Sequence, residues 1–158
     1  MAKHAGRVIS MDIDYAAVDL NYCKNRKEKI DNVYPLVFDL SNPSPSIGFA
    51  NAERPRLEDR SKPDMIVALA IIHHLTVTYN IPFEILAKHF NDLGADLLIE
   101  YVDREDSQFK KILKNKGTDY SHYTKENFET SFLQYYEITE KIDITDAYRT
   151  LYFLKSKK

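Results

Sequence analysis

The sequence predicts an α/β fold, with a mostly parallel sheet covered by helices on both faces and an antiparallel strand pair at the end. Apolar runs typical of strands alternate with stretches of helical periodicity. The most apolar run, residues 65–72, lacks polar alternation, as in a parallel strand buried on both faces. The last two expected strands are joined by a short turn around Asp146, which favours antiparallel pairing. The length of 158 residues fits a single domain, 1–158.

The first strand is expected at residues 8–11, within "RVISMDID", where the apolar run ends in carboxylates. A helix over "DYAAVDLNYCKNRKEK" follows, with Asp14 as its N-cap. Ala16, Leu20 and Cys23 have helical spacing and are expected to form its buried stripe. Cys23, the only cysteine, is therefore interpreted as a packing residue rather than a nucleophile.

The second strand, "VYPLVFDL", again ends on an acid, Asp39. The next stretch, "SNPSPSIGFANAERPRLEDRSKP", holds four prolines and one glycine, and loops of this length are usually functional or disordered. Phe49 indicates order, because a disordered linker seldom keeps an aromatic residue in such polar surroundings.

The third strand, "DMIVALAII", ends on His73 and His74, which places this pair at the carboxyl end of a central strand, where open α/β sheets bind ligands. The segment "IPFEILAKHFNDLG" is predicted to be a helix that ends at Gly94. Its apolar stripe consists of Phe83, Leu86, Ala87, Phe90 and Leu93.

The rest of the chain is expected to form one strand, two helices and two strands. The strand is "ADLLIEYV", and the helices are "SQFKKILKNK" and "TKENFETSFLQYY", the latter with Thr124 as N-cap. The segments "YEITEKIDIT" and "RTLYFLKSKK" are the closing strand pair.

Composition excludes several classes of protein. A net charge of −2 leaves no electrostatic footprint for general nucleic-acid binding. The longest apolar run, about eight residues, is far short of the ~20 that span a bilayer. One cysteine allows neither an internal disulfide nor a cysteine-based zinc cluster, and no signal peptide is visible. We therefore expect a cytoplasmic protein.

Asp12 and Asp39 both end strands at the same expected edge of the sheet. A carboxylate there needs hydrogen-bond donors, and the hydroxyls of a ribose or the amino group of an adenine are suitable ones. The alternative is that each acid only caps a helix or a turn.

The motifs "VISMDID", "LVFDLSNP", "PDMIVALAIIHHL" and "DLLIEYV", in this order and spacing, resemble those of class I S-adenosylmethionine-dependent methyltransferases. More narrowly, "DLSNPSPSIGFANAER" and the histidine pair resemble nodulation-protein-related methyltransferases of bacteria. The resemblance covers residues 7–102 and implies a Rossmann-like methyltransferase sheet with S-adenosyl-L-methionine as cofactor.

The resemblance also implies roles for individual residues. Asp12 would hold the two ribose hydroxyls of the cofactor, and Asp39 with the backbone of Leu40 would read the adenine ring. Ile13 would pack on that ring, while the methionine part would lie close to the end of the third strand. The implied cofactor positions are Asp12, Ile13, Asp39, Leu40, Ala68 and Leu69.

One part of the pattern is absent. A first strand and glycine-rich turn should stand ~20 residues before Asp12, which lies beyond Met1. We therefore expect a partial domain that lacks one strand between those at residues 8–11 and 65–72. This predicts weak or no cofactor binding, and either a missing N-terminal segment or self-association through aromatic residues; a micromolar cofactor affinity would contradict the prediction.

The histidines suit a general base that deprotonates the acceptor as the methyl group arrives. Alternatively, one imidazole packs in the core while the other borders the pocket. A metal site is less favoured, because adjacent side chains diverge and no third ligand has a suitable spacing. Glu53 is a further candidate base, whereas Asn51, Arg54 and Glu100 are candidate substrate contacts. Glu53 and Arg54 could equally form a surface ion pair.

Three functions remain compatible with the sequence. The first is methyl transfer to a small molecule or a protein, incomplete in this chain. The second is a non-catalytic relic that serves as a binding or assembly module. The third is an NAD-dependent oxidoreductase, which the acid at position 39 and the terminal antiparallel pair disfavour.

Overall fold

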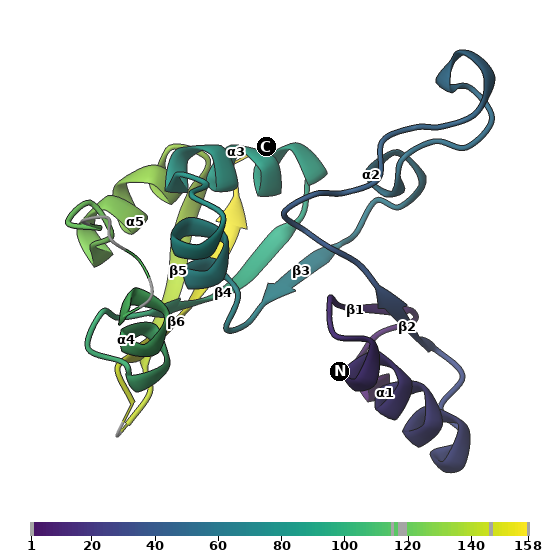
Figure 1. Ribbon diagram of the computed structural model, residues 1–158, viewed down its shortest axis with the longest axis horizontal. Coiled ribbons are helices and arrows are strands. Elements are labelled where there is room, and N and C mark those ends of the chain that lie inside the picture. The colour runs from purple at the N-terminus through teal and green to yellow at the C-terminus, as the bar shows by residue number, and fades with distance from the viewer. Residues whose placement is uncertain (1, 115, 117–119, 146, 158) are drawn as a thin grey trace. The chain divides into compact units, whose positions relative to one another are not determined.

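The structure is a computed structural model that describes residues 2–114, 116, 120–145 and 147–157. The chain divides into two compact units, Met1–Arg56 and Leu57–Lys158. The described strands form two separate sheets, one of two strands and one of four (Figure 1). The single-domain organisation stays a prediction. Within the described ranges, no helix is long and apolar enough to cross a membrane.

The first unit consists of two parallel strands and one long helix, after a short 3-10 turn at Ala2–His4. Strand β1 (Val8–Asp12) pairs in parallel with β2 (Val33–Val37). Helix α1 (Tyr15–Glu28) connects them, and the Asp14 side chain accepts the Ala16 amide at its start, as predicted.

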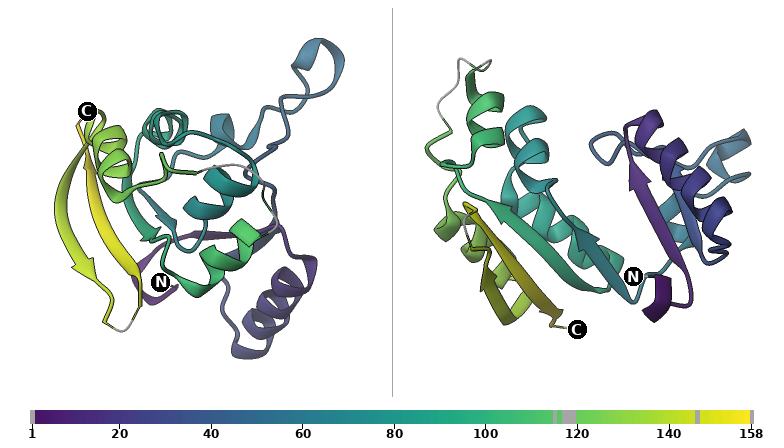
Figure 2. Two further views of the ribbon diagram at one scale, coloured as in Figure 1. Left: turned by 60° about the vertical axis from the view of Figure 1, so that its left-hand side comes forward. Right: turned by 90° about the horizontal axis from the view of Figure 1, so that it is seen from below.

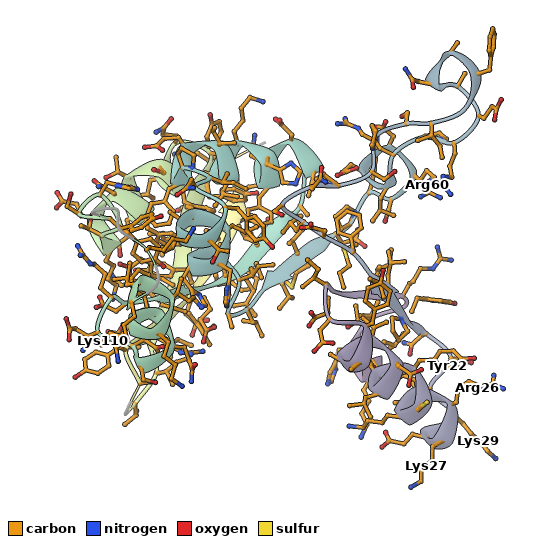
Figure 3. The ribbon with its side chains drawn as sticks, viewed as in Figure 1. Tyr22, Arg26, Lys27, Lys29, Arg60 and Lys110 are labelled. Atoms are coloured by element: carbon orange, nitrogen blue, oxygen red, sulfur yellow. The ribbon has the colours of Figure 1, made fainter. Side chains whose placement is uncertain are left out.

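Helix α1 buries a different face from the predicted one. Leu20 is 70% exposed, and Ala16 and Cys23 are exposed as well, so the expected stripe and the packing role of Cys23 are wrong within this unit. The side that contacts the two-stranded sheet instead carries Asn21, whose Nδ2 donates to Oγ of Ser10 in β1. The last turn gathers three cations, which suit the negative end of the helix dipole (Figure 3). They are Arg26, Lys27 and Lys29.

The second unit begins with the short helix α2 (Leu57–Arg60) and contains a four-stranded mixed sheet. The sheet order is β3-β4-β6-β5, with β3 parallel to β4 and both remaining pairings antiparallel. The strands are β3 (Met65–Ala68), β4 (Asp96–Val102), β5 (Tyr136–Asp143) and β6 (Arg149–Ser156). The predicted antiparallel pair at the end is confirmed, and Figure 2 shows β5 and β6 side by side. The turn predicted at position 146 lies outside the described residues.

Three helices of this unit match the prediction. They are α3 (Phe83–Leu93), α4 (Ser107–Lys114) and α5 (Lys125–Leu133). Gly94 ends α3 in a left-handed conformation, with φ of 80°, and the Thr124 side chain caps α5 by accepting the Asn127 amide. Four of the five predicted stripe residues of α3 are buried: Phe83, Leu86, Ala87 and Phe90.

Strand β3 is shorter than predicted and lies at the edge of its sheet. It ends at Ala68, and Ala70 turns the backbone with a positive φ of 51°. Ile72 is fully buried, but it belongs to the helical segment after this turn, which continues into a π-helical turn at His74–Thr78. The prediction that the histidines end the strand is therefore wrong. They lie on the helical segment because the apolar run supplies both elements.

An aromatic cluster forms the core of the second unit. Tyr101 of β4 stacks on Tyr123 with ring centroids 5.4 Å apart, and Phe83 meets the ring of Phe128 edge-on at 5.6 Å. The Tyr123 hydroxyl donates to the Val102 carbonyl at 2.9 Å, so this buried phenol has a partner. The cluster therefore joins α3, α5 and β4.

Replacing Phe128 by alanine should lower the free energy of unfolding by about 3–5 kcal/mol, because the buried ring leaves a cavity among its aromatic neighbours. Phe49→Ala is the matched control, since Phe49 is 87% exposed, and should change stability by less than about 0.5 kcal/mol. Chemical denaturation followed by circular dichroism measures both values. Equal effects of the two variants would contradict this assignment of the core.

Candidate functional site

The two predicted nucleoside-binding acids both lie at the carboxyl edge of the two-stranded sheet. Asp12 is the last residue of β1, opposite Val37 of β2, and Asp39 follows two positions later. Oδ1 of Asp12 accepts the Asp14 amide at 2.9 Å, while Oδ1 of Asp39 accepts the Ser41 amide at 2.9 Å and its hydroxyl at 2.6 Å. Each acid therefore fixes a local turn with one oxygen. Among the described residues, none bonds Oδ2 of either acid.

Two neighbours share this edge. Ile13 is 53% exposed, and Leu40 is half-buried beside Asp39. An exposed branched side chain next to two carboxylates offers an apolar surface for a ring, while the second carboxylate oxygens remain free to accept hydrogen bonds. This edge therefore presents hydrogen-bond acceptors beside an apolar side chain, a combination that suits the hydroxyls and the ring of a nucleoside.

The loop candidates form a separate excursion of the first unit. Ile47 and Arg54 exchange backbone hydrogen bonds of 3.0 and 3.1 Å, which close a tight loop around the 3-10 turn Phe49–Asn51. Glu53 accepts the Phe49 amide at 3.1 Å, so the carboxylate braces the loop rather than pairing with Arg54. Asn51 is exposed, with a left-handed φ of 57°. Phe49, taken from the sequence as a sign of order, points to solvent. The roles of these residues in catalysis and substrate binding stay predictions.

In the second unit, a charged network surrounds the turn that follows β3. Ala68 is buried and Leu69 is half exposed at the end of the strand. Glu100 of β4 accepts the amide of Ala70 with Oε2 at 2.6 Å, which holds that residue in its left-handed conformation. Its Oε1 lies 3.4 Å from Nη1 of Arg149. Glu100 therefore positions a turn, and both of its oxygens are engaged.

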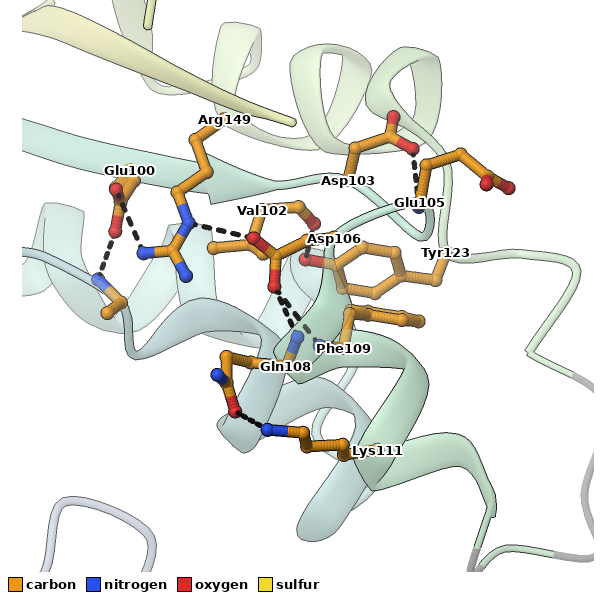
Figure 4. A network of polar contacts seen from close by, with 11 residues as sticks. Glu100, Val102, Asp103, Glu105, Asp106, Gln108, Phe109, Lys111, Tyr123 and Arg149 are labelled. Carbon is orange, nitrogen blue, oxygen red and sulfur yellow. Dashed lines mark hydrogen bonds and ion pairs between the residues drawn. The ribbon is translucent and has the colours of Figure 1, made fainter. Parts of the chain in front are cut away.

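Arg149 joins this network to helix α4 (Figure 4). Its Nε donates to Oδ2 of Asp106 at 3.0 Å, and Oδ1 of Asp106 accepts the amides of Gln108 and Phe109 at the start of α4. Burial raises the pKa of Asp106, but the hydrogen bonds from Arg149 and the two amides outweigh it, and the pKa lies below its ordinary value. Asp106 is therefore held ionised as helix cap and as ion-pair partner.

A cavity of about 340 Å³ lies beside this network, entirely within the second unit. Its walls carry two imidazoles, a guanidinium, an ammonium, an amide and two aliphatic side chains. The lining residues are Ala70, His73, His74, Gln108, Lys111, Ile112 and Arg149. The second unit thus has a cavity with charged and polar side chains in its walls, beside the turn that follows β3.

The two histidines of the cavity differ in environment. His73 is only 2% exposed and its Nδ1 has no hydrogen-bond partner in the described structure, whereas His74 is exposed. The rings lie 4.2 Å apart between centroids. Burial, followed by the charges of His74 and Arg149, lowers the pKa of His73 to about 4, and burial also lowers that of His74. A neutral, weakly basic His73 suits a hydrogen-bonding role better than proton abstraction.

The sequence missed part of this site. The structure brings together three residues that the sequence analysis named with four that it did not name. The named residues are His73, His74 and Glu100, and the others are Asp106, Gln108, Lys111 and Arg149. Asp106 has a partial signal, because the acidic stretch "DRED" follows a predicted strand. Arg149 has none, since it lies 49 residues beyond its partner Glu100. Within the described residues, no group of three histidine, cysteine, aspartate or glutamate side chains could hold a metal ion.

Comparison with known proteins supports the fold. No family model matches the chain. The chain is 30% identical to nodulation protein NoeA of Rhizobium meliloti (strain 1021) over 148 residues, which is 94% of this chain and 31% of that protein. The chain thus spans about a third of the length of the curated relative it matches. The narrower resemblance to nodulation-related proteins is confirmed by this match.

Two solved structures are similar over nearly the whole chain. A SAM-dependent methyltransferase from Aquifex aeolicus matches with a TM-score of 0.59 and 14% identity, covering 97% of this chain and 72% of that one. The PH0226 protein from Pyrococcus horikoshii OT3 matches with a TM-score of 0.58 and 12% identity, covering 96% and 72%. The predicted Rossmann-like α/β fold of the methyltransferase type is thereby confirmed.

The pKa of His73 predicts a pH dependence of stability. The unfolded chain binds a proton at His73 near pH 6.5, whereas the folded chain binds it only near pH 4. As the pH falls from 6.5 to 4, the unfolded state therefore gains protons first, and the free energy of unfolding should fall by up to about 3 kcal/mol. Denaturation curves across this range measure the loss. The variant His73→Gln should remove this part of the slope; parallel curves for the two proteins would contradict it.

Proposed function

We propose that this chain is the catalytic part of an S-adenosylmethionine-dependent methyltransferase that acts on a small molecule or a protein. The observation that carries the proposal is the similarity to the Aquifex aeolicus methyltransferase over 97% of the chain. The match to nodulation protein NoeA over 94% of the chain agrees with the narrower resemblance seen in the sequence.

The residues of the first unit fit the nucleoside part of this cofactor. Asp12 and Asp39 each keep Oδ2 without a partner among the described residues, while Oδ1 is fixed by a local turn. A carboxylate that is already oriented accepts hydrogen bonds from a ribose diol or an adenine amino group at little entropic cost. Ile13, exposed beside them, would cover the face of the adenine ring, and the backbone of Leu40 would contact the ring edge.

In the second unit, Ala68 and Leu69 keep the role that the resemblance implies, next to the methionine part. When bound, the cofactor supplies a methyl group on a sulfonium centre. What this chain contributes is orientation: Glu100 fixes the turn directly after these residues through the amide of Ala70.

The proton on the acceptor has two candidate bases, His73 and His74. His74 is exposed on the cavity wall and is the better of the two, because His73 is buried and its pKa is about 4. Glu53 braces its own loop by accepting the Phe49 amide and stays a weaker candidate. A reactive sulfonium needs little further activation of the acceptor once the groups are aligned.

The two alternatives lack comparable support. The strand order β3-β4-β6-β5 ends in an antiparallel pair, which the methyltransferase hypothesis expects and which disfavours an NAD-dependent oxidoreductase. A non-catalytic relic would have no need for the oriented Oδ2 atoms of Asp12 and Asp39, which are free to accept hydrogen bonds. We also expect a cytoplasmic location, as the composition indicates.

Binding of S-adenosylhomocysteine at millimolar concentration should shift the amide NMR signals around Asp12 and Asp39, while NAD should not. The variants Asp12→Asn and Asp39→Asn keep an oxygen for the local turn but replace Oδ2 by a donor that cannot accept a ribose or adenine hydrogen. Each should weaken binding at least about tenfold, the equivalent of one charged hydrogen bond.

Asp19→Asn on the exposed side of α1 is the control and should leave the affinity unchanged. Shifts confined to other regions, or equal shifts with NAD, would overturn the assignment of the cofactor.

A further inference from the structure

The cavity of the second unit is lined by cationic and neutral hydrogen-bond donors, and Glu100 and Asp106 engage only some of them. Arg149 donates to Asp106 with Nε and to Glu100 with Nη1. The remaining guanidinium nitrogen has no partner among the described residues. Figure 4 shows this nitrogen turned away from both carboxylates, toward the side of Gln108. The two ion pairs therefore act as a clamp that fixes the direction of a free donor.

A second cation stands on the same wall. Lys111 lines the cavity one helical turn after Gln108, and its Nζ lies 3.3 Å from Oε1 of that residue. Amide contacts of this length are weak, so the ammonium can exchange Gln108 for a better acceptor. Its side chain is exposed and costs little to reorient.

The lining of the cavity also includes a buried imidazole, that of His73. His73 is almost fully buried, and its Nδ1 has no hydrogen-bond partner in the described structure. A buried polar atom without a partner is costly, so a hydrogen bond that this imidazole gained on binding would be favourable. An imidazole N–H is a suitable donor to an anionic oxygen.

We propose that this cavity binds an oxyanion, a carboxylate or a phosphate, carried by the methyl acceptor, with Arg149, Lys111 and His73 as its donors. The assignment to the acceptor rests on the proposed function, whereas binding of the anion itself depends only on the second unit. Ile112 gives one apolar wall for the carbon skeleton next to the charged group. A volume of about 340 Å³ holds a small-molecule fragment of this kind.

The electrostatics of the cavity support the choice of charge. The Coulombic influence of Arg149 on His73 lowers its pKa and exceeds the opposite influence of Asp106. Arg149 and Lys111 both line the cavity, and no carboxylate is among its described lining residues. An anion bound there would be favoured, and a cation would meet both Arg149 and Lys111.

The test titrates the full chain with inorganic phosphate and, separately, with benzoate, against chloride at equal ionic strength, while NMR follows the His73 imidazole. A saturable shift of the His73 signals and a rise of its pKa on binding are expected with at least one probe. Which probe binds more tightly distinguishes phosphate from carboxylate. No response beyond that of chloride would overturn the proposal.

Matched variants locate the site. Lys111→Ala removes a donor without touching the ion pairs of Arg149 and should weaken anion binding about tenfold. Lys110→Ala, on the neighbouring position of α4, removes a cation that pairs with Glu105 outside the cavity and should leave the affinity unchanged (Figure 3). Equal losses in both variants would mean diffuse attraction and overturn the site.

Competition separates this proposal from the cofactor assignment. S-adenosylhomocysteine should leave the bound anion in place. Displacement of the anion would mean that the amino-acid carboxylate of this ligand binds in the cavity, and it would overturn the assignment of the anion to the acceptor. Anion binding without any response around Asp12 and Asp39 would instead count against the proposed function and leave the anion site standing.

Discussion

The second unit depends on one buried arrangement of charges, in which Arg149 lies between Glu100 and Asp106. Carboxylates this buried are stable only when donors surround them, and the guanidinium supplies one donor to each. The outer oxygens of the two acids then bind backbone amides: Glu100 holds the turn after β3, and Asp106 starts helix α4. Arg149 of β6 is thus linked through these two acids to β4, to the turn after β3 and to the start of α4. The cavity is lined by residues of this turn and this helix together with Arg149.

The two units are built to different degrees of completeness. The second buries a large aromatic cluster, in which Tyr101 contacts both Tyr123 and Phe128. Among its described residues, the first has two strands, one α-helix and two 3-10 turns, and its apolar side chains are largely exposed. Those more than a third exposed there include Met11, Ile13, Tyr15, Leu20, Tyr22, Tyr34, Leu36 and Ile47. The acids of the first unit gain their order from local turns instead, which need no core.

The sequence predicted most elements but erred where one apolar run served two of them. Helix α3 and strand β4 were predicted correctly because periodicity and the stop at Gly94 depend on local residues. Residues 65–72 read as one strand because the left-handed turn at Ala70 carries no glycine to mark it. That conformation is held by Glu100, thirty residues away, so no local pattern reveals it. Cys23 and Leu20 were wrongly predicted to be buried for a related reason. Helical spacing identifies an apolar face, but it does not show whether another element packs on that face.

The site residues divide in the same physical way. Acids at strand ends are visible in a sequence, because a carboxylate after an apolar run is locally anomalous, whereas Arg149 stands at the start of an ordinary strand. Satisfaction of hydrogen bonds then separates structural roles from binding roles. Glu100 has both oxygens engaged and acts as a positioning residue, while Asp12, Asp39 and Arg149 each bind the protein with part of their polar atoms and leave the rest oriented and free. Such partial engagement is what a preorganised binding group requires, since the fixed contacts meet the entropic cost before a ligand arrives.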